Sequence, residues 1–351
     1  MALAEPLVRD APVDDVFAAA VGATHPRRAA LVAVIGLAAI VVAMYGIRSA
    51  DTTLRCALAA VGIGALFNGL QRLGRMRFGG EFALGFWLAL AFLILVLFCA
   101  IFADLLPIDS YRKTEIVFRR ARPRLSFDEP LGRDANGASL LSRVIFSARV
   151  SLLVAVLSVS IGLFVGSLLG LVGGFFGGWV DAVLNIITNS TLAFPPLILL
   201  FAIVAVFSRS IWTLGIGLAI VSVPTYARVM RAQTISVRQR EFVLASRSMG
   251  ANGRRIMFRE ILPNALLPVA SYSFIVAAAV VVAEGSLAFL GLGIPPPRPS
   301  WGSMVADGQI KLKTDPHLVF VPAAVMFLTV LSFNRIGDWA RKRVMGERNL
   351  M

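Results

Sequence analysis

The stretch that decides the fold is Glu241–Pro268, which reads EFVLASRSMGANGRRIMFREILPNALLP. It is basic and amphipathic, has a glycine at its centre, and lies between two apolar segments of the chain. Each of those segments is long enough to cross a bilayer as a helix, which takes about 20 apolar residues. The polar stretch between them is therefore expected in water, as a helix-turn-helix that offers a docking surface to another protein.

The composition of the whole chain also indicates a membrane protein. Of its 351 residues 58% are hydrophobic and 15% are charged, and its mean hydropathy is +0.80. A soluble domain of ordinary surface polarity cannot bury so many apolar side chains. The net charge of +14 does not indicate nucleic-acid binding, because the basic residues are scattered between apolar blocks. We expect the chain to have membrane lipid, and no nucleic acid, as a partner.

The sequence has few residues in patterns that could catalyse a reaction or bind a metal or cofactor. Cys56 and Cys99 lie in apolar runs without a C-x-x-C spacing, and His25 and His317 are far apart. The sequence also has no G-x-x-x-x-G-K-[ST] phosphate loop, no H-E-x-x-H and no G-x-S-x-G pattern. The sequence therefore predicts no catalytic residue, no cofactor and no metal site in this chain, and it disfavours a membrane enzyme.

Apolar segments of the required length predict about eight spanning helices. Two of them come first, at residues 29–47 and 55–70, and the second is diluted by Arg55 and Asn68. The later segments lie at residues 82–106, 151–172, 180–207, 211–230, 266–290 and 318–339. The sequence thus predicts an all-α polytopic membrane protein.

Basic residues near the helix ends predict the orientation. Arginines at 27–28, at 72–77, between 228 and 259, and at 341 and 343 fall on one side of an eight-helix chain. That side is expected to be the cytoplasm, which places both termini there. The segment at 112–124 disagrees, because its basic residues would lie outside. The other four regions outweigh it.

The quoted stretch resembles the cytoplasmic coupling loop of ABC importer permeases. In that family a pair of small residues precedes a glycine, and a Leu-Pro follows later. The residues at these places are Ala245, Ser246, Gly250, Leu262 and Pro263. The family's acidic residue before the small pair is Leu244 here, with Glu241 one turn upstream. The resemblance implies that these residues, with Glu241 and Ala251, couple the chain to an ATPase.

Four further patches resemble the second permease subunit of dipeptide, oligopeptide and nickel ABC importers. The first patch is Leu131, Gly132 and Asp134, followed by ARVSL at 148–152. The second is GGFFGGWVD at 173–181 with AFP at 193–195, and the third is AE at 283–284 with FLGLG at 289–293 and PSWG at 299–302. The fourth is FN at 333–334 with GD at 337–338. The resemblance spans residues 82–338. It implies a six-helix permease core preceded by about two extra N-terminal transmembrane helices.

The resemblance and the apolar pattern together predict the organisation of the chain. The expected parts are a cytoplasmic tail at 1–28, an accessory transmembrane hairpin at 29–77, the first core helix and a long outer loop at 78–150, the permease core at 151–340 with its coupling loop at 231–265, and a cytoplasmic tail at 341–351. Residues 294–314, which include Trp301, are expected as an ordered outer loop. That loop would face the mouth of the pathway or contact a substrate-delivering protein.

Three residues inside the spans are candidates for the pathway or a gate: Glu284, Asn189 and Pro195. An acid within an apolar span is costly and often functional, so Glu284 is either a pathway residue or a buried structural anchor. Asn189 and Ile186 stand where the family commonly has an Asp and an Arg. Losing both partners of a buried ion pair can be nearly neutral, so we expect a retained fold with altered pathway polarity. Pro195 is expected to kink its helix.

The resemblance implies the permease subunit of an ATP-driven importer for di- or oligopeptides in the bacterial cytoplasmic membrane. Its expected partners are a homologous second permease, two ATPase subunits or domains that bind ATP and Mg, and an external substrate-binding protein. An importer of nickel chelates or other small solutes is the alternative within this class. An ion-coupled secondary transporter is the alternative outside it, and it would require several buried acids at mid-membrane. Only Glu284 is a candidate for such an acid.

Overall fold

A computed structural model describes residues 26–42, 52–78, 82–111, 131–134 and 136–348. The predicted N-terminal tail up to residue 25 and the basic segment at 112–124 lie outside the described residues. The chain divides into two units, Met1–Trp87 and Leu88–Met351. The sequence places the end of the accessory hairpin at residue 77. The first unit ends ten residues later, in the first turn of the helix that starts at Leu84.

The first unit contains a hairpin of two helices, α2 (Pro26–Val41) and α3 (Thr52–Phe78). Their backbones pack closely at facing glycines, since a Cβ on Gly36 would lie 2.7 Å from the carbonyl oxygen of Gly62. Small residues permit such an approach between membrane helices. Within their described residues neither helix combines the length and the apolar composition of the core spans. Their crossing of the membrane therefore stays a prediction.

Five helices of the described chain are long and apolar enough to cross a membrane. They are α4 (Leu84–Ile101), α5 (Leu140–Phe176), α8 (Ile211–Arg238), the continuous run Gly253–Phe289 that ends in α11 (Leu262–Phe289), and α13 (His317–Arg348). They coincide with five of the six predicted core spans. The prediction of an all-α polytopic membrane protein is confirmed.

The sixth predicted span, residues 180–207, is not one straight helix. It consists of α6 (Gly178–Ala193) and α7 (Pro196–Val206), which meet at an angle of 86°. Two consecutive prolines cause the break: neither donates a backbone hydrogen bond, and Phe194 before them is extended, with φ −79° and ψ 132°. The kink expected at Pro195 is therefore a sharp break of the span.

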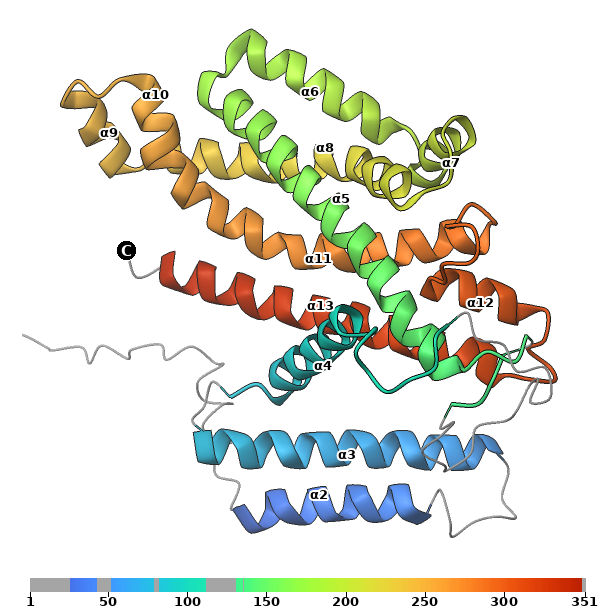
Figure 1. Ribbon diagram of the computed structural model, residues 1–351. Coiled ribbons are helices and arrows are strands. Elements are labelled where there is room, and N and C mark those ends of the chain that lie inside the picture. The colour runs from blue at the N-terminus through green and yellow to red at the C-terminus, as the bar shows by residue number, and fades with distance from the viewer. Residues whose placement is uncertain (1–25, 43–51, 79–81, 112–130, 135, 349–351) are drawn as a thin grey trace, which may run out of the picture. The chain divides into compact units, whose positions relative to one another are not determined.

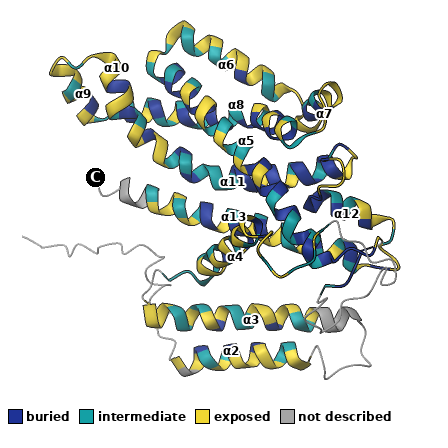
Figure 2. Ribbon diagram, viewed as in Figure 1, coloured by how far each residue is buried: buried dark blue, intermediate teal, exposed yellow. Residues whose placement is uncertain are grey.

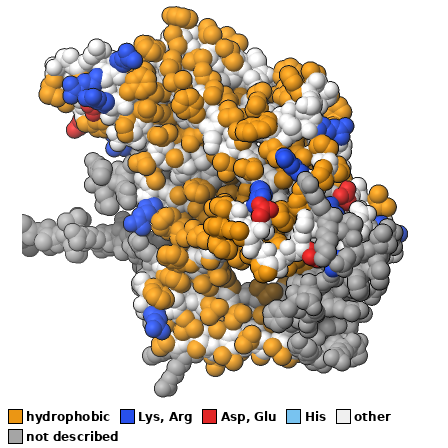
Figure 3. All heavy atoms as spheres, in the orientation of Figure 1, with side chains coloured by type: hydrophobic (Ala, Val, Ile, Leu, Met, Phe, Trp, Pro, Cys, Tyr) orange, Lys and Arg blue, Asp and Glu red, His pale blue; other side chains and the backbone are white. Residues whose placement is uncertain are grey.

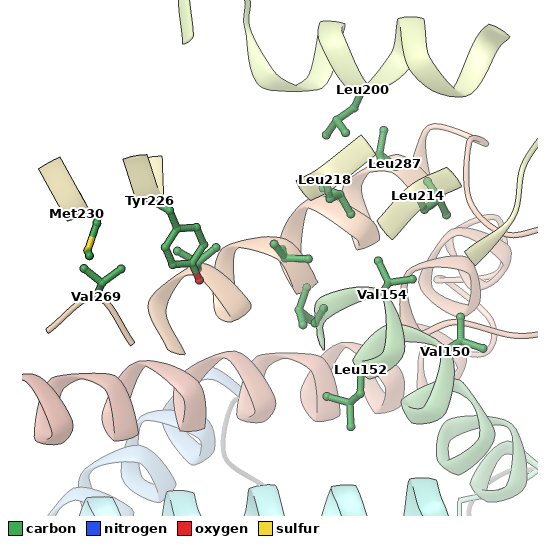
Figure 4. Packing of buried hydrophobic residues seen from close by; sticks show 14 of the residues in the cluster. Val150, Leu152, Val154, Leu200, Leu214, Leu218, Tyr226, Met230, Val269 and Leu287 are labelled. Atoms are coloured by element: carbon green, nitrogen blue, oxygen red, sulfur yellow. The ribbon is translucent and has the colours of Figure 1, made fainter. Parts of the chain in front are cut away.

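The helices α5 and α8 form the centre of the second unit, and α5 crosses both α8 and α11 (Figure 1). Glycines spaced by one turn along α5 allow this contact. A Cβ on Gly166 would lie 2.5 Å from Cβ of Tyr226, and one on Gly170 would lie 2.3 Å from the carbonyl oxygen of Ala227. Figure 4 shows the buried apolar side chains that α5, α7, α8 and α11 contribute to this core.

The predicted outer loop at 294–314 contains a helix, α12 (Trp301–Gln309). A reciprocal cap begins it, in which the side chains of Ser300 and Ser303 each bond to the other residue's backbone N–H. Trp301 is fully buried, and its indole N–H donates to the carbonyl oxygen of Val144 at 3.1 Å. The segment predicted as an ordered loop is thus partly helical, and its Trp301 packs inside the unit.

The outward faces of the core spans are apolar. Figure 2 shows exposed residues along these helices, and large apolar side chains such as Phe164 and Ile186 are 74% and 65% exposed. In a soluble protein such continuous patches are rare. Here they are the surfaces available to lipid and to other membrane subunits.

Candidate functional site

The predicted coupling loop folds as two short helices. After α8 come α9 (Glu241–Ser248) and α10 (Gly253–Arg255), and a π-helical turn, η3 (Ile256–Ile261), leads into α11. Figure 1 places α9 and α10 at one end of α11 and α12 at the other. The loop is therefore a structured projection at one end of the bundle.

A Schellman turn ends α9, and it explains the spacing of the small residues and the glycine. The N–H of Gly250 bonds to the carbonyl oxygen of Arg247, and the N–H of Ala251 bonds to that of Ser246, each at 3.0 Å. Gly250 has φ +81°, the left-handed conformation that this motif requires at its turning residue. The N–H of Met249 bonds to the carbonyl oxygen of Ala245 at 3.0 Å. Glycine is needed at position 250 for its backbone conformation and not for a close approach, because a Cβ there would meet no atom within 4 Å.

The Leu-Pro pair marks the start of α11. Pro263 has no N–H, so the carbonyl oxygen four residues earlier loses its usual helical donor. The backbone accommodates this with a wide turn, in which the N–H of Leu262 bonds to the carbonyl oxygen of Met257 five residues back. Pro263 thus fixes the place where the loop becomes a spanning helix.

The face that α9 presents to water is partly apolar. Val243 is fully buried and anchors α9, whereas Phe242, Leu244 and Met249 are 40%, 49% and 81% exposed. Glu241 lies in the first turn of α9, where a negative charge is favourable with the helix dipole. Exposed apolar side chains on a short, anchored helix are suited to insertion into a groove of another protein.

The loop is fixed to the end of α5. The guanidinium of Arg238 donates to the carbonyl oxygen of Phe175 at 2.7 Å, and a Cβ on Gly253 would lie 3.6 Å from the ring of Phe175. Exposed arginines, among them Arg247 and Arg254, surround the loop and form the blue patch over α9 and α10 in Figure 3. The projection is therefore basic as well as partly apolar.

A second polar group joins α6 to α8. Arg231 forms two hydrogen bonds with Asp181, each of 2.5 Å, and Asn185 donates to the same carboxylate at 2.9 Å. Farther along α6, the carbonyl oxygen of the Asn189 side chain accepts from Arg228 at 3.1 Å. The candidate residue Asn189 is therefore paired with an arginine.

Glu284 lies in the joint between α5, α11 and α12. Its side chain is 1% exposed, and one carboxylate oxygen accepts from the hydroxyl of Ser151 at 3.0 Å. The backbone N–H of Trp301 bonds to that same hydroxyl at 3.4 Å. The other carboxylate oxygen has no hydrogen-bond partner in the part of the chain that the structure describes. Glu284 thus lies inside the unit, whereas Asn189 lies on α6 and Pro195 follows it.

The chain matches a known family over most of this region. The model of the binding-protein-dependent transport system inner membrane component matches residues 158–346. The chain is a permease of this family. The matched range contains the coupling loop, both arginine pairs and Glu284, whereas the α2–α3 hairpin lies outside it. The expected resemblance to ABC importer permeases is confirmed, and the permease is a multi-pass inner-membrane protein.

Several curated permeases are similar to this one. A dipeptide transport system permease protein from Alkalihalophilus pseudofirmus is 37% identical over 242 residues, which cover 69% of this chain and 79% of the relative. Glutathione transport system permease proteins from Pectobacterium atrosepticum and Shigella flexneri are 34% and 38% identical over 251 and 254 residues. These cover 71% and 72% of this chain and 83% of each relative.

The sequence did not identify the arginines of this permease that contact α6. Arg228 and Arg231 lie three residues apart near the end of an apolar segment, and a charge inside such a segment is a functional signal by itself. Their partners are at least 39 residues away in the chain, so the pairing has no local pattern. The roles of the predicted coupling and gate residues stay predictions.

Proposed function

We propose that this permease is one transmembrane subunit of an ATP-driven importer of di- or oligopeptides. The observation that carries the coupling part of the proposal is α9, a short helix with exposed apolar side chains, fixed by the Schellman turn at Gly250. The peptide part is supported by the dipeptide and glutathione transport permeases, which this chain resembles over more than two thirds of its length.

In this proposal two ATPase subunits bind ATP and Mg, and this chain contributes no catalytic step. One ATPase receives α9 in a groove, where Phe242, Leu244 and Met249 are covered. Closure of the ATPases on nucleotide moves α9, and the movement reaches the bundle through Arg238 and the π-helical turn before α11. The bundle then switches between outward and inward access together with its partner.

The remaining partners follow from the same architecture. A homologous second permease covers part of the apolar faces and completes the pathway. The coupling-loop end is cytoplasmic, as are both termini, because basic residues gather near those helix ends. An external binding protein delivers the solute to the opposite end of the bundle, which carries α12.

A matched pair of variants tests the coupling part. Leu244→Asp places a charge on the exposed apolar face of α9, and Ile310→Asp places the same charge at the other end of the bundle, where Ile310 is 87% exposed. We expect Leu244→Asp to lose co-purifying ATPases and Ile310→Asp to retain them. Equal retention in both variants would refute docking through α9.

Reconstituted complexes test the peptide part. Proteoliposomes that contain the permease, its partners and purified binding protein are expected to accumulate labelled alanyl-alanine only with hydrolysable ATP. A nickel chelate serves as the competing solute. Uptake of the chelate without peptide uptake would replace the peptide proposal with the metal-chelate alternative.

A further inference from the structure

A pocket of about 670 Å³ lies between the middle of α5, the start of α8 and the loop that joins α11 to α12. Sites for small ligands typically have volumes of about 300–1,000 Å³. The start of α8 is the end of that helix farther from the coupling loop, because α8 leads directly into α9. The pocket is therefore separate from the surface proposed to receive the ATPase.

The interior of the pocket is apolar. Leu157 on α5, Ile211 on α8 and Ile294 in the loop line it, and each is buried or half-buried. Val156 and Trp212 also line it, and they are 61% and 68% exposed. The pocket therefore opens onto the apolar outer surface of α5 and α8, which is available to lipid.

Two exposed arginines line the same pocket. Arg209 is fixed in place, because its guanidinium donates to the carbonyl oxygen of Gly291 at 2.7 Å, and further N–H donors remain on it. Arg298 makes no hydrogen bond or ion pair with the described residues. No acidic side chain lines the pocket in the part of the chain that the structure describes. The pocket thus combines an apolar interior with two cations at its opening.

We propose that this pocket binds an anionic phospholipid, with an acyl chain in its interior and the phosphate on Arg209 and Arg298. A phosphate carries negative charge and only accepts hydrogen bonds, so it matches guanidinium donors. An acyl chain has no polar group, so it matches the interior. The permease belongs to an inner-membrane family, so phospholipid is always present around it.

A peptide matches this pocket less well than a phospholipid does. Its ammonium group and its amide N–H groups need acceptors, and no Asp, Glu, Asn or Gln lines the pocket within the described ranges. Ser210, which does line it, is already used, since its hydroxyl accepts from the N–H of Thr213 at 3.1 Å. The proposed lipid is therefore distinct from the imported solute, and the proposal holds whichever solute is carried.

Photo-crosslinking with a defined lipid tests the site. The assembled transporter, in nanodiscs of phosphatidylcholine, receives a small fraction of phosphatidylglycerol that carries a diazirine on one acyl chain. Crosslinked residues are mapped by mass spectrometry, and the yield at each is expressed relative to all crosslinks in the chain. We expect crosslinks at Leu157, Ile211 and Ile294. Unlabelled phosphatidylglycerol is expected to displace the probe there, although phosphatidylcholine is already in excess.

Three variants separate the charge of the site from its volume. Arg298→Gln breaks no bond within the described chain and is expected to lower the relative yield in the pocket about five-fold, for unit charges about 4 Å apart in water. Val156→Trp fills space at an exposed position without changing the charge and is also expected to lower the yield. Lys313→Gln removes an exposed cation that does not line the pocket, and the yield should not change.

Each contrary result has a definite meaning. Absence of crosslinks in the pocket would show that another subunit covers it, and would overturn the proposal. A yield that ignores Arg298, or that falls equally in Lys313→Gln, would exclude recognition of the phosphate by this site. Displacement of the probe by inorganic phosphate would indicate a site for free anions, and displacement by alanyl-alanine would indicate a site for the solute. Either displacement would refute binding of a lipid.

Discussion

Replacing Gly250 tests whether the turn after α9 transmits the ATPase motion. The residue has φ +81°, and a Cβ built there meets no atom within 4 Å. A substitution therefore adds backbone strain without a steric clash in this chain. For an L-residue the left-handed conformation costs about 1–2 kcal/mol, which shifts an equilibrium by about 5- to 30-fold.

A graded series separates strain from size. Asn tolerates positive φ best, Ala less well, and the β-branched Val worst. In reconstituted complexes with binding protein, we expect substrate-stimulated ATP hydrolysis and uptake to fall in the order Gly250→Asn, Gly250→Ala, Gly250→Val. Gly250→Glu is expected to lose both activities. Membrane insertion should stay normal in every variant, because we expect the polar loop to lie outside the bilayer.

Gly253 provides the matched control three residues away. It lies in α10, has no positive φ, and its Cβ would make an ordinary contact of 3.6 Å with Phe175. Gly253→Ala is therefore expected to keep stimulated hydrolysis and uptake. Normal coupling in Gly250→Val, or equal damage in Gly253→Ala, would refute the argument from backbone conformation.

Further predictions concern the bundle. Glu284→Gln should lower complex yield and uptake together, because Glu284 is buried in a joint; normal yield with altered uptake would indicate a pathway role instead. Gly166→Ala should lower the thermal stability of the complex, since its Cβ would lie 2.5 Å from Tyr226, whereas Gly217→Ala, with nearest contacts of 3.4 Å, should not. Asp181→Asn should cost about 1–3 kcal/mol of stability by weakening a charge-assisted pair, measured by thermal unfolding of the complex. A permease without residues 1–78 should still insert and co-purify with the second permease, and failure of both would show that the hairpin is required.

Local sequence features predicted the spans and the turn well. The length and apolarity of a segment decide whether it forms a spanning helix, and both are visible in the chain itself. The conformation of Gly250 was predictable for the same reason, because glycine is preferred where a helix ends in the left-handed region. Five of the six core spans and the Schellman turn therefore agree with the sequence.

Features that depend on distant partners were not predictable. Pro195 indicated a kink, but the 86° angle also depends on where α7 packs, and Leu200 of α7 is buried in the core. The burial of Trp301 depends on Val144, which is 157 residues away in the chain. The contact of Arg228 with Asn189 likewise joins two helices. No periodicity in the sequence encodes such pairs.

The helix α11 connects the coupling loop to the joint around Glu284. From Leu262 to Glu284 it extends about 33 Å at a rise of 1.5 Å per residue, comparable to the thickness of the hydrocarbon core. The π-helical turn at its start and Pro268 inside it are places where a helix bends, so α11 alone would absorb part of any displacement of α9. A second connection runs from Arg238 to the end of α5, and α5 carries Ser151, which bonds to Glu284. Because both connections lead from the loop to Glu284, we expect a displacement of the loop to move α5 and α11 together.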